Sequence, residues 1–468
     1  MNFRTVSVYA VGIALGAALS LITLPILAWL FPPEDVGRVS LFQLSLSLIV
    51  VFFSLGLDQS YVRNFNEVND KIYLARICMM PGLFALLISI ALAGTYAKQL
   101  SYWLFGLDSS FLYGIFSFAV VVLYLERFFS VFIRMKELSF AYSLTRVLPK
   151  LLFLVFVFGV FLFPAQKSFV LLAGMQSLCW LLVVLIMLGY LKSEYLKGGK
   201  LAFEFRTTRE LLYFGFPLML NGIAFWGLNF LDRIMLKELS SLSELGVYAV
   251  ASTLAGAAIL FQQIFTTMWH PLIYKWVSEG AAATKLKNIN ESVQLFALVL
   301  ICIIALCSFV VIYLLPEAYA SARFMLPACM IPPLYIMITE VSGIGISISK
   351  RTKFLPVITL VCVLVNLSFN YYLIPIFGAG GAAASTALAF SLYLMLKTEV
   401  SNRVWVSFSN AKFYTFSSFV VALCVLSALF GDALGYGLYI GWVAALCLCM
   451  LGYKAQVRLL HNFIKGRS

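Results

Sequence analysis

Charged residues are scarce in this sequence, at 11% of its 468 positions, and histidine occurs only twice. Hydrophobic residues make up 62% and the mean hydropathy is +0.98. A soluble protein of this length could not hide so much apolar surface, because it would need a largely polar exterior. The composition therefore excludes a soluble fold and indicates a polytopic membrane protein.

The sequence also lacks a recognisable set of metal ligands. All nine cysteines fall in apolar runs, and none has a His, an Asp or a second thiol at a metal-ligand spacing. We expect them to be small buried hydrophobic residues, with no disulfide, metal or cofactor. The net charge of +13 comes from basic residues in short clusters between apolar runs, which is typical of topology signals rather than of a nucleic-acid interface.

Apolar runs of membrane-spanning length recur along the whole chain, and we predict an all-α fold with fourteen transmembrane helices. The predicted spans are residues 6–30, 39–57, 77–97, 111–131, 147–163, 168–190, 211–231, 245–268, 292–315, 324–346, 355–375, 381–398, 413–430 and 434–453. Most of the Lys and Arg residues then lie on the side of the N-terminus. The positive-inside rule makes that side, and therefore both termini, cytoplasmic.

An internal repeat divides the predicted spans into two lobes. The pattern Glu34-Asp35-Val36-Gly37 after the first span recurs as Ser243-Glu244-Leu245-Gly246 after the seventh. We predict an N-terminal six-helix lobe over 1–200, a second over 201–404, and helices 13 and 14 with a cytoplasmic tail over 405–468. Lobes of six spans each enter the membrane from the same side, so the repeat is parallel, and a cavity between such lobes is how many transporters build alternating access.

Ionisable residues within or beside the spans are the candidates for function, because no predicted loop is large enough to form a domain. Basic residues are the candidates for binding an anionic substrate: Arg63, Arg127, Arg134, Arg146 and Lys150 toward the cytoplasm, and Arg233 toward the outside. The guanidinium group suits phosphate oxygens. The alternative for each of them is a topology role, in which the side chain only reaches the membrane surface.

Two asparagines form the strongest local pattern, in the stretch from Asn366 through Asn370, Pro375 and Gly378 to Thr386. Asn366 and Asn370 are four residues apart and share one helix face, which must meet another helix or water because lipid cannot satisfy an amide. The pattern fits either substrate contact or hydrogen bonding between helices.

This stretch, together with Gly56-Leu57-Asp58-Gln59-Ser60-Tyr61-Val62-Arg63 and Leu231-Asp232-Arg233-Ile234-Met235, resembles the O-antigen and polysaccharide flippases. These are the Wzx-type branch of the multidrug/oligosaccharidyl-lipid/polysaccharide exporter superfamily. The resemblance implies a transporter, not an enzyme, that moves an undecaprenyl-pyrophosphate-linked oligosaccharide from the cytoplasmic to the outer leaflet of the bacterial inner membrane. It further implies membrane lipids, a polysaccharide polymerase and chain-length proteins as partners, and a role in O-antigen or lipopolysaccharide biosynthesis.

Three carboxylates are the candidates for coupling to H⁺ or Na⁺, should export use an ion gradient: Glu340, Asp58 and Asp232. For Asp232 a local pairing with Arg233 is the alternative. A drug or cation antiporter of the same superfamily, similar to the MATE transporters, is the rival function. An organic-cation pump should present an acidic cavity, whereas the charges here are mostly basic, which favours an anionic substrate.

Overall fold

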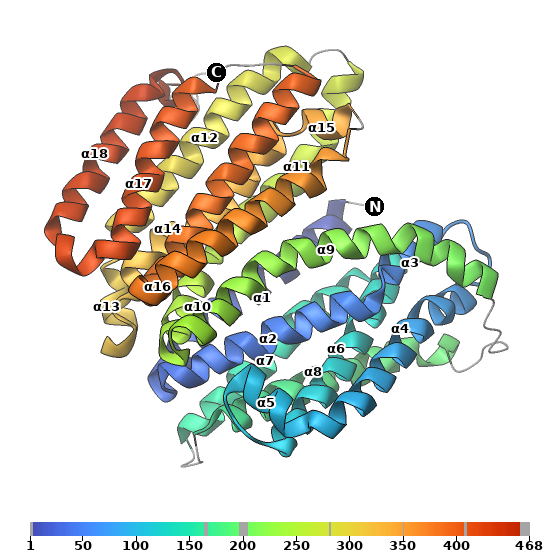
Figure 1. The fold of residues 1–468 in the computed structure, drawn as a ribbon. Coiled ribbons are helices and arrows are strands. Elements are labelled where there is room, and N and C mark those ends of the chain that lie inside the picture. Colours follow the sequence, from blue (N-terminus) through green and yellow to red (C-terminus); the bar gives the residue numbers. More distant parts are fainter. Residues whose placement is uncertain are drawn as a thin grey trace. The chain divides into compact units, whose positions relative to one another are not determined.

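The computed structural model describes residues 3–162, 167–195, 205–279, 282–349, 351–406 and 410–458, and within these ranges all regular structure is helical (Figure 1). The predicted all-α membrane fold is confirmed. Nine of the described helices are long and apolar enough to cross a bilayer, or ten if one bent pair, α10 (Leu242–Ala255) with α11 (Ala257–Ser278), is a single span. The number fourteen stays a prediction.

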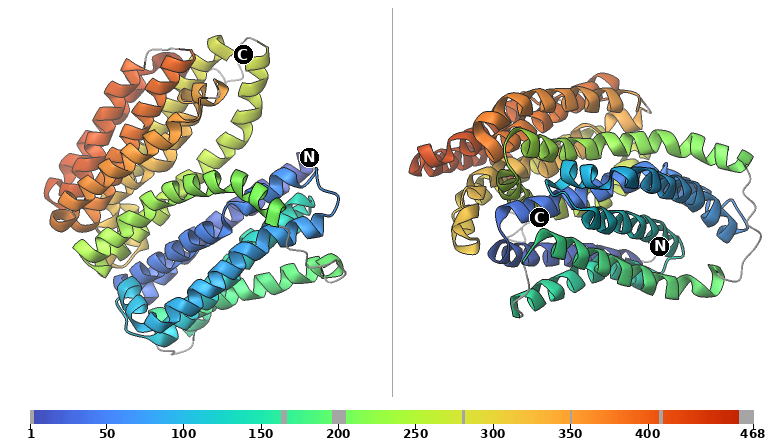
Figure 2. Two further views of the ribbon diagram at one scale, coloured as in Figure 1. Left: turned by 45° about the vertical axis from the view of Figure 1, so that its right-hand side comes forward. Right: turned by 60° about the horizontal axis from the view of Figure 1, so that its bottom comes forward.

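The chain divides into two compact units, residues 1–230 and 231–468. The first contains α1 (Phe3–Leu30), α2 (Pro33–Ser54), α3 (Leu57–Asn64), α4 (Lys71–Ala93), α5 (Ala97–Phe105), α6 (Ser110–Met135), α7 (Ser139–Leu162), α8 (Phe169–Tyr195) and most of α9 (Phe205–Leu239). Within this unit α1 packs along α7, and α6 packs on both α2 and α8 (Figure 2). The predicted division of the spans into two lobes, with a boundary at residue 200, stays a prediction.

The second unit is built around α14 (Ala322–Ser342), which packs against six other helices of the unit. The remaining elements are α10, α11, α12 (Ala282–Leu306), α13 (Val310–Leu314), α15 (Gly345–Ile348), α16 (Phe354–Val404), α17 (Ala411–Leu434) and α18 (Tyr436–Gly452). Helices α17 and α18, predicted to lie outside the repeat, pack on α12, α14 and α16 of this unit. The tail beyond residue 458 lies outside the described residues.

Helix α16 is a hairpin of two antiparallel helices rather than one rod. A straight helix of its 51 residues would extend about 75 Å. Instead, Ile358 and Cys362 near one end form a cluster with Ile346 against which Leu396 and Val400, near the other end, are packed. The chain reverses at Gly378, whose backbone (φ 52°, ψ −127°) is open to glycine and strained for other residues. The two halves agree with the predicted spans 355–375 and 381–398.

Gly378→Ala is expected to lower the free energy of unfolding by about 1–3 kcal/mol, because an alanine would be strained at this φ. Its Cβ would also lie 2.5 Å from Oε2 of Glu244, the oxygen that accepts a hydrogen bond from the Ala379 amide at 2.8 Å. The measurement is the thermal unfolding midpoint of the purified protein in detergent. Gly437→Ala is the matched control, since a Cβ there meets no atom within 4 Å. Equal midpoints for the two variants would contradict the expectation.

Candidate functional site

Asp232 lies at the centre of a buried polar group in the second unit, and only 1% of the residue is exposed. One carboxylate oxygen accepts a hydrogen bond from Asn370 Nδ2 at 2.6 Å. The other accepts bonds from the Thr386 hydroxyl at 2.5 Å and the Tyr248 hydroxyl at 3.1 Å. Asn370 Nδ2 also donates to Asn366 Oδ1 at 3.1 Å. We call Asp232, Tyr248, Asn366, Asn370 and Thr386 the Asp232 cluster.

The α16 hairpin brings this cluster together. Asn366 and Asn370 share a face on its first half, and Thr386 lies on the returning half, with Asn366 Nδ2 donating to the Thr386 hydroxyl at 3.5 Å. Small residues before Thr386 allow the second half to approach closely: a Cβ on Gly381 would lie 2.4 Å from the carbonyl oxygen of Leu373. The structure therefore places both predicted asparagines against the predicted aspartate.

One amide oxygen of the Asp232 cluster is left over. Asn370 Oδ1 is buried and has no hydrogen-bond partner among the described residues. An amide oxygen that is buried in the same cluster as a carboxylate is of the kind that hard cations prefer as ligands. The arrangement can therefore hold a proton or a small monovalent cation against Asp232.

The partners of Asp232 were only partly visible in the sequence. Thr386 ends the motif that the sequence singles out, but Tyr248 was missed, although it lies two residues after the repeated Glu-Leu-Gly pattern. Arg233, the predicted outer basic residue, is intermediate in burial, and its guanidinium lies 5.8 Å from the centre of the Tyr248 ring. Both residues of the Asp232-Arg233 pair thus contact Tyr248.

An ion pair between a buried carboxylate and a half-buried guanidinium is the main polar feature of the first unit. Arg127 on α6 donates to Asp58 on α3 at 2.8 Å, and Gln59 Nε2 donates to the same carboxylate oxygen at 2.9 Å. The side chain of Asp58 is 2% exposed and that of Arg127 is 33% exposed. Asp58 Oδ1 and Arg127 Nε are buried and have no partner among the described residues. The pair therefore leaves one carboxylate oxygen and one guanidinium nitrogen without a hydrogen bond from the described residues.

Two further predicted cations lie on α7 of the same unit. Arg146 donates to the hydroxyls of Ser130 at 3.3 Å and Tyr142 at 3.4 Å, and Lys150 donates to the carbonyl oxygen of Gly16 at 2.9 Å. Both residues remain exposed while making these contacts. Glu126 is buried on α6 and attracts the charges of Arg146 and Arg127. Three cations and two carboxylates, the second being Asp58, leave this membrane bundle with a local positive excess.

The other predicted basic residues of the first unit are less closely involved. Arg63 at the end of α3 stacks over the Phe214 ring of α9, 4.3 Å from its centre. Arg134 is half-buried in the last turn of α6. The first unit therefore brings Asp58 and Arg127 into direct contact, while the two cations Arg146 and Lys150 lie on the neighbouring helix α7.

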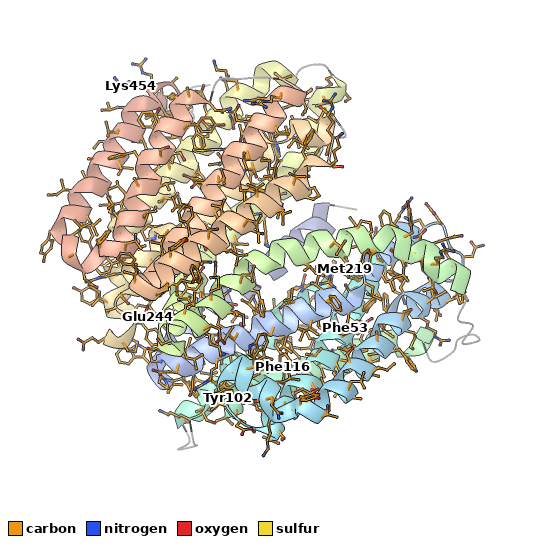
Figure 3. The ribbon with its side chains drawn as sticks, viewed as in Figure 1. Phe53, Tyr102, Phe116, Met219, Glu244 and Lys454 are labelled. Carbon is orange, nitrogen blue, oxygen red and sulfur yellow. The ribbon has the colours of Figure 1, made fainter. Side chains whose placement is uncertain are left out.

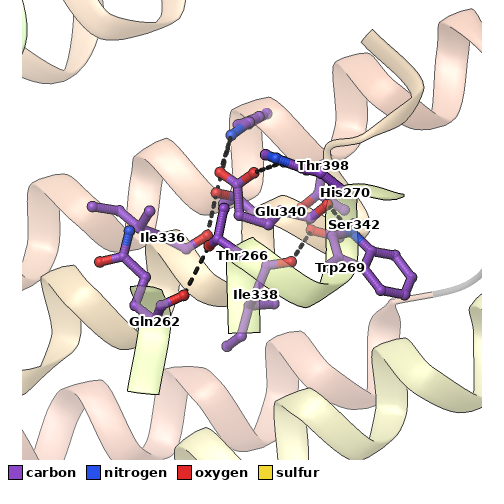
Figure 4. Close-up of polar contacts among 11 residues, drawn as sticks. Gln262, Thr266, Trp269, His270, Ile336, Ile338, Glu340, Ser342 and Thr398 are labelled. Atoms are coloured by element: carbon purple, nitrogen blue, oxygen red, sulfur yellow. Dashed lines mark hydrogen bonds and ion pairs between the residues drawn. The ribbon is translucent and has the colours of Figure 1, made fainter. Parts of the chain in front are cut away.

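Glu340, a predicted coupling residue, lies in a separate polar contact group of the second unit (Figure 4). One oxygen is 2.9 Å from His270 Nε2, and the other is 3.7 Å from Lys397 Nζ. The indole nitrogen of Trp269 donates to the Glu340 carbonyl oxygen at 2.8 Å. These partners could not be predicted from the sequence, because they lie dozens of residues away on α11 and α16. Both carboxylate oxygens of Glu340 thus already face basic side chains.

No cluster of three or more His, Cys, Asp or Glu side chains suited to a metal ion occurs in the part of the chain that the structure describes. The nine cysteines are free thiols, and Cys307 and Cys447 are exposed, which differs from the prediction that all are buried. Both exposed thiols lie on long apolar segments.

Comparison with solved structures defines the class of this fold. The chain is similar to the lipid II flippase MurJ in an inward closed conformation, with a TM-score of 0.72 and 11% identity over 97% of this chain and 99% of that one. It is also similar to an inward-facing multidrug resistance MATE family transporter of the MOP superfamily, with a TM-score of 0.55 and 15% identity over 83% and 94%. The protein therefore has the same helical membrane fold as these two proteins.

The sequence narrows this class to one family. A family model described as polysaccharide biosynthesis protein matches residues 3–277, which is more than half of the chain, and the chain belongs to that family. The resemblance to polysaccharide flippases of the MOP superfamily is confirmed. No protein in the search of curated sequences matches the chain.

Proposed function

We propose that this protein is a flippase that moves an undecaprenyl-pyrophosphate-linked glycan repeat unit, of O-antigen or a similar surface polysaccharide, from the cytoplasmic to the outer leaflet by alternating access. Membership of the polysaccharide biosynthesis family supports a glycan substrate. Similarity to a solved lipid II flippase supports a fold that accommodates a lipid-linked sugar. The membrane would be the bacterial inner membrane, with both termini in the cytoplasm and a polymerase and chain-length proteins as partners.

The cations of the first unit carry this proposal. A pyrophosphate needs its negative charge matched during a crossing, and Arg127, Arg146 and Lys150 are cations in or beside an apolar helix bundle. Side chains that only set topology would point their charges at water alone. Here Arg127 is fixed by Asp58, and Lys150 by the Gly16 carbonyl oxygen, so the charges are held in place before a substrate arrives. Arg63, Arg134 and Arg233 are proposed as further contacts for the anionic head group.

The Asp232 cluster is proposed as the site that couples transport to an H⁺ or Na⁺ gradient, with Asn366 and Asn370 as ion ligands rather than sugar ligands. Its carboxylate accepts hydrogen bonds from the neutral side chains of Asn370, Thr386 and Tyr248, and the amide oxygen of Asn370 has no partner in the part of the chain that the structure describes. Asp58 and Glu340 fit this role less well, because each carboxylate is already paired with basic side chains. Neutralising a buried carboxylate changes the free energy of the protein most when no cation forms an ion pair with it.

The proposal is tested with purified protein in vesicles that carry a lipid-linked glycan, by following the access of an external lectin to the sugar. Arg146→Gln with Lys150→Gln is expected to slow glycan movement about tenfold or more, since two charge-assisted hydrogen bonds worth ~1.5–3 kcal/mol each are lost. Lys98→Gln with Lys454→Gln removes the same charge from exposed positions and serves as the control.

Full activity of the α7 double variant at normal protein levels would contradict an anionic head-group site there. Vesicles that expel organic cations while leaving the lipid-linked glycan in place would instead establish the drug antiporter function.

A further inference from the structure

An apolar pocket of about 320 Å³ lies within the first unit, between α2, α4, α5 and α6. Its wall includes Phe53, Phe105, Phe116 and Trp103, together with aliphatic side chains, and Phe53 and Phe116 are marked in Figure 3. An engineered cavity of ~150 Å³ lined in this way stays dry and binds benzene. A pocket of twice that volume in a membrane helix bundle can therefore take a stretch of hydrocarbon chain.

Helix α5 places the pocket near one surface of the membrane. This nine-residue helix covers the pocket with Leu100 and Leu104, while Tyr102 (Figure 3) and Trp103 are more than half exposed. Exposed Tyr and Trp side chains on a short amphipathic helix are typical of the boundary between hydrocarbon and head groups. Trp103 both lines the pocket and reaches the exterior, so the pocket adjoins the surrounding lipid.

The polar atoms of the pocket distinguish between kinds of hydrocarbon. Tyr113 donates its hydroxyl to the Ile90 carbonyl oxygen, and Ser101 donates to that of Leu107, both at 2.7 Å. Ser45 is only 2% exposed, and its hydroxyl oxygen has no hydrogen-bond partner among the described residues. The double bond of an isoprenoid unit can accept a weak hydrogen bond from a hydroxyl, whereas a saturated acyl chain offers no acceptor.

The pocket also shares a helix face with a cation of the proposed head-group site. Tyr113, Ser117, Val120 and Arg127 on α6 are four, three and seven residues apart, the spacing of one face. Arg127 lies about 10 Å along the helix axis from Val120. Charge and apolar volume in this order match a lipid whose phosphate is next to its hydrocarbon chain.

We propose that this pocket binds a segment of the polyisoprenoid chain of the lipid cargo, oriented so that the phosphate end points toward Arg127. This inference rests on the proposed function for the identity of the cargo. It assigns the chain of the lipid to the first unit and gives Ser45 a role in selecting an unsaturated chain.

The test uses a glycan-free polyprenyl phosphate that carries a photoreactive diazirine near the end of its chain, added to the full-length protein in vesicles. Labelled peptides are expected in α4, α5 or α6, and unlabelled polyprenyl phosphate should compete. Ala93→Trp fills the pocket and is expected to reduce labelling about tenfold, a loss of ~1.4 kcal/mol of binding. Ala91→Trp, at an exposed position of the same helix turn that does not line the pocket, is the matched control.

A saturated alkyl phosphate probe of equal length distinguishes a site for polyisoprenoid chains from a site for any acyl chain. Equal labelling by both probes would overturn the inference in favour of a site for any acyl chain. Equal labelling of the two tryptophan variants would show that the pocket is not the site of labelling. A protein that moves lipid-linked glycan but is not labelled here keeps its proposed function and loses this pocket. Specific labelling without glycan movement supports the pocket and counts against the proposed function alone.

Discussion

Asp232→Asn is expected to abolish the dependence of glycan movement on an imposed ion gradient and to slow gradient-driven movement about tenfold or more. Asparagine keeps the size of the side chain and one acceptor oxygen for the cluster, but it carries no charge for H⁺ or Na⁺ to neutralise. A coupling ion can shift the transport equilibrium only by its differential interaction with the states of the carrier. Removal of the carboxylate removes that difference, worth ~1.4 kcal/mol for each factor of ten.

The measurement is glycan movement in vesicles with and without a proton or sodium gradient. Asp432→Asn is the matched control, since the Asp432 side chain is on α17 of the same unit and is 83% exposed. A response to the gradient that persists in Asp232→Asn would contradict the assignment. Loss of the response to one ion but not the other would identify the coupling ion.

Arg127→Ala is expected to destabilise the protein by about 3–5 kcal/mol, because it leaves the Asp58 carboxylate buried without its cation. The Asp58 side chain is 2% exposed, and Arg127 is its basic partner in the described structure. Breaking a buried pair costs more than removing it entirely, since an unpaired charge remains in a medium of low dielectric constant. The measurement is the unfolding midpoint in detergent.

The double variant Asp58→Asn with Arg127→Gln separates stability from transport. It removes both charges, so the unfolding midpoint should recover most of the loss, while glycan movement should stay slow if Arg127 contacts the anionic head group. Recovery of both properties would show that Arg127 serves only to neutralise Asp58. Normal stability of Arg127→Ala alone would contradict the importance of the pair itself.

Local patterns in the sequence predicted much of this protein's organisation. The apolar runs predicted an all-α membrane fold, because helix length is set by bilayer thickness. The pairing of Asn366 with Asn370 on one face followed from helical periodicity, and the break near Pro375 and Gly378 followed from the backbone preferences of these residues. These features depend only on neighbours in the sequence.

Partners that are distant in the chain could not be obtained in this way. The sequence did not reveal that Tyr248 bonds to Asp232, that Lys397 and His270 flank Glu340, or that α5 covers an apolar pocket. A single sequence shows which side chains cannot face lipid, but it does not contain the distances between helices. Composition and periodicity therefore determined the class of fold and the polar residues that need partners. Helix packing alone decided which polar groups meet, since those contacts depend on the close approach of different helices, from 16 residues apart for Tyr248 and Asp232 to 154 for Thr386 and Asp232.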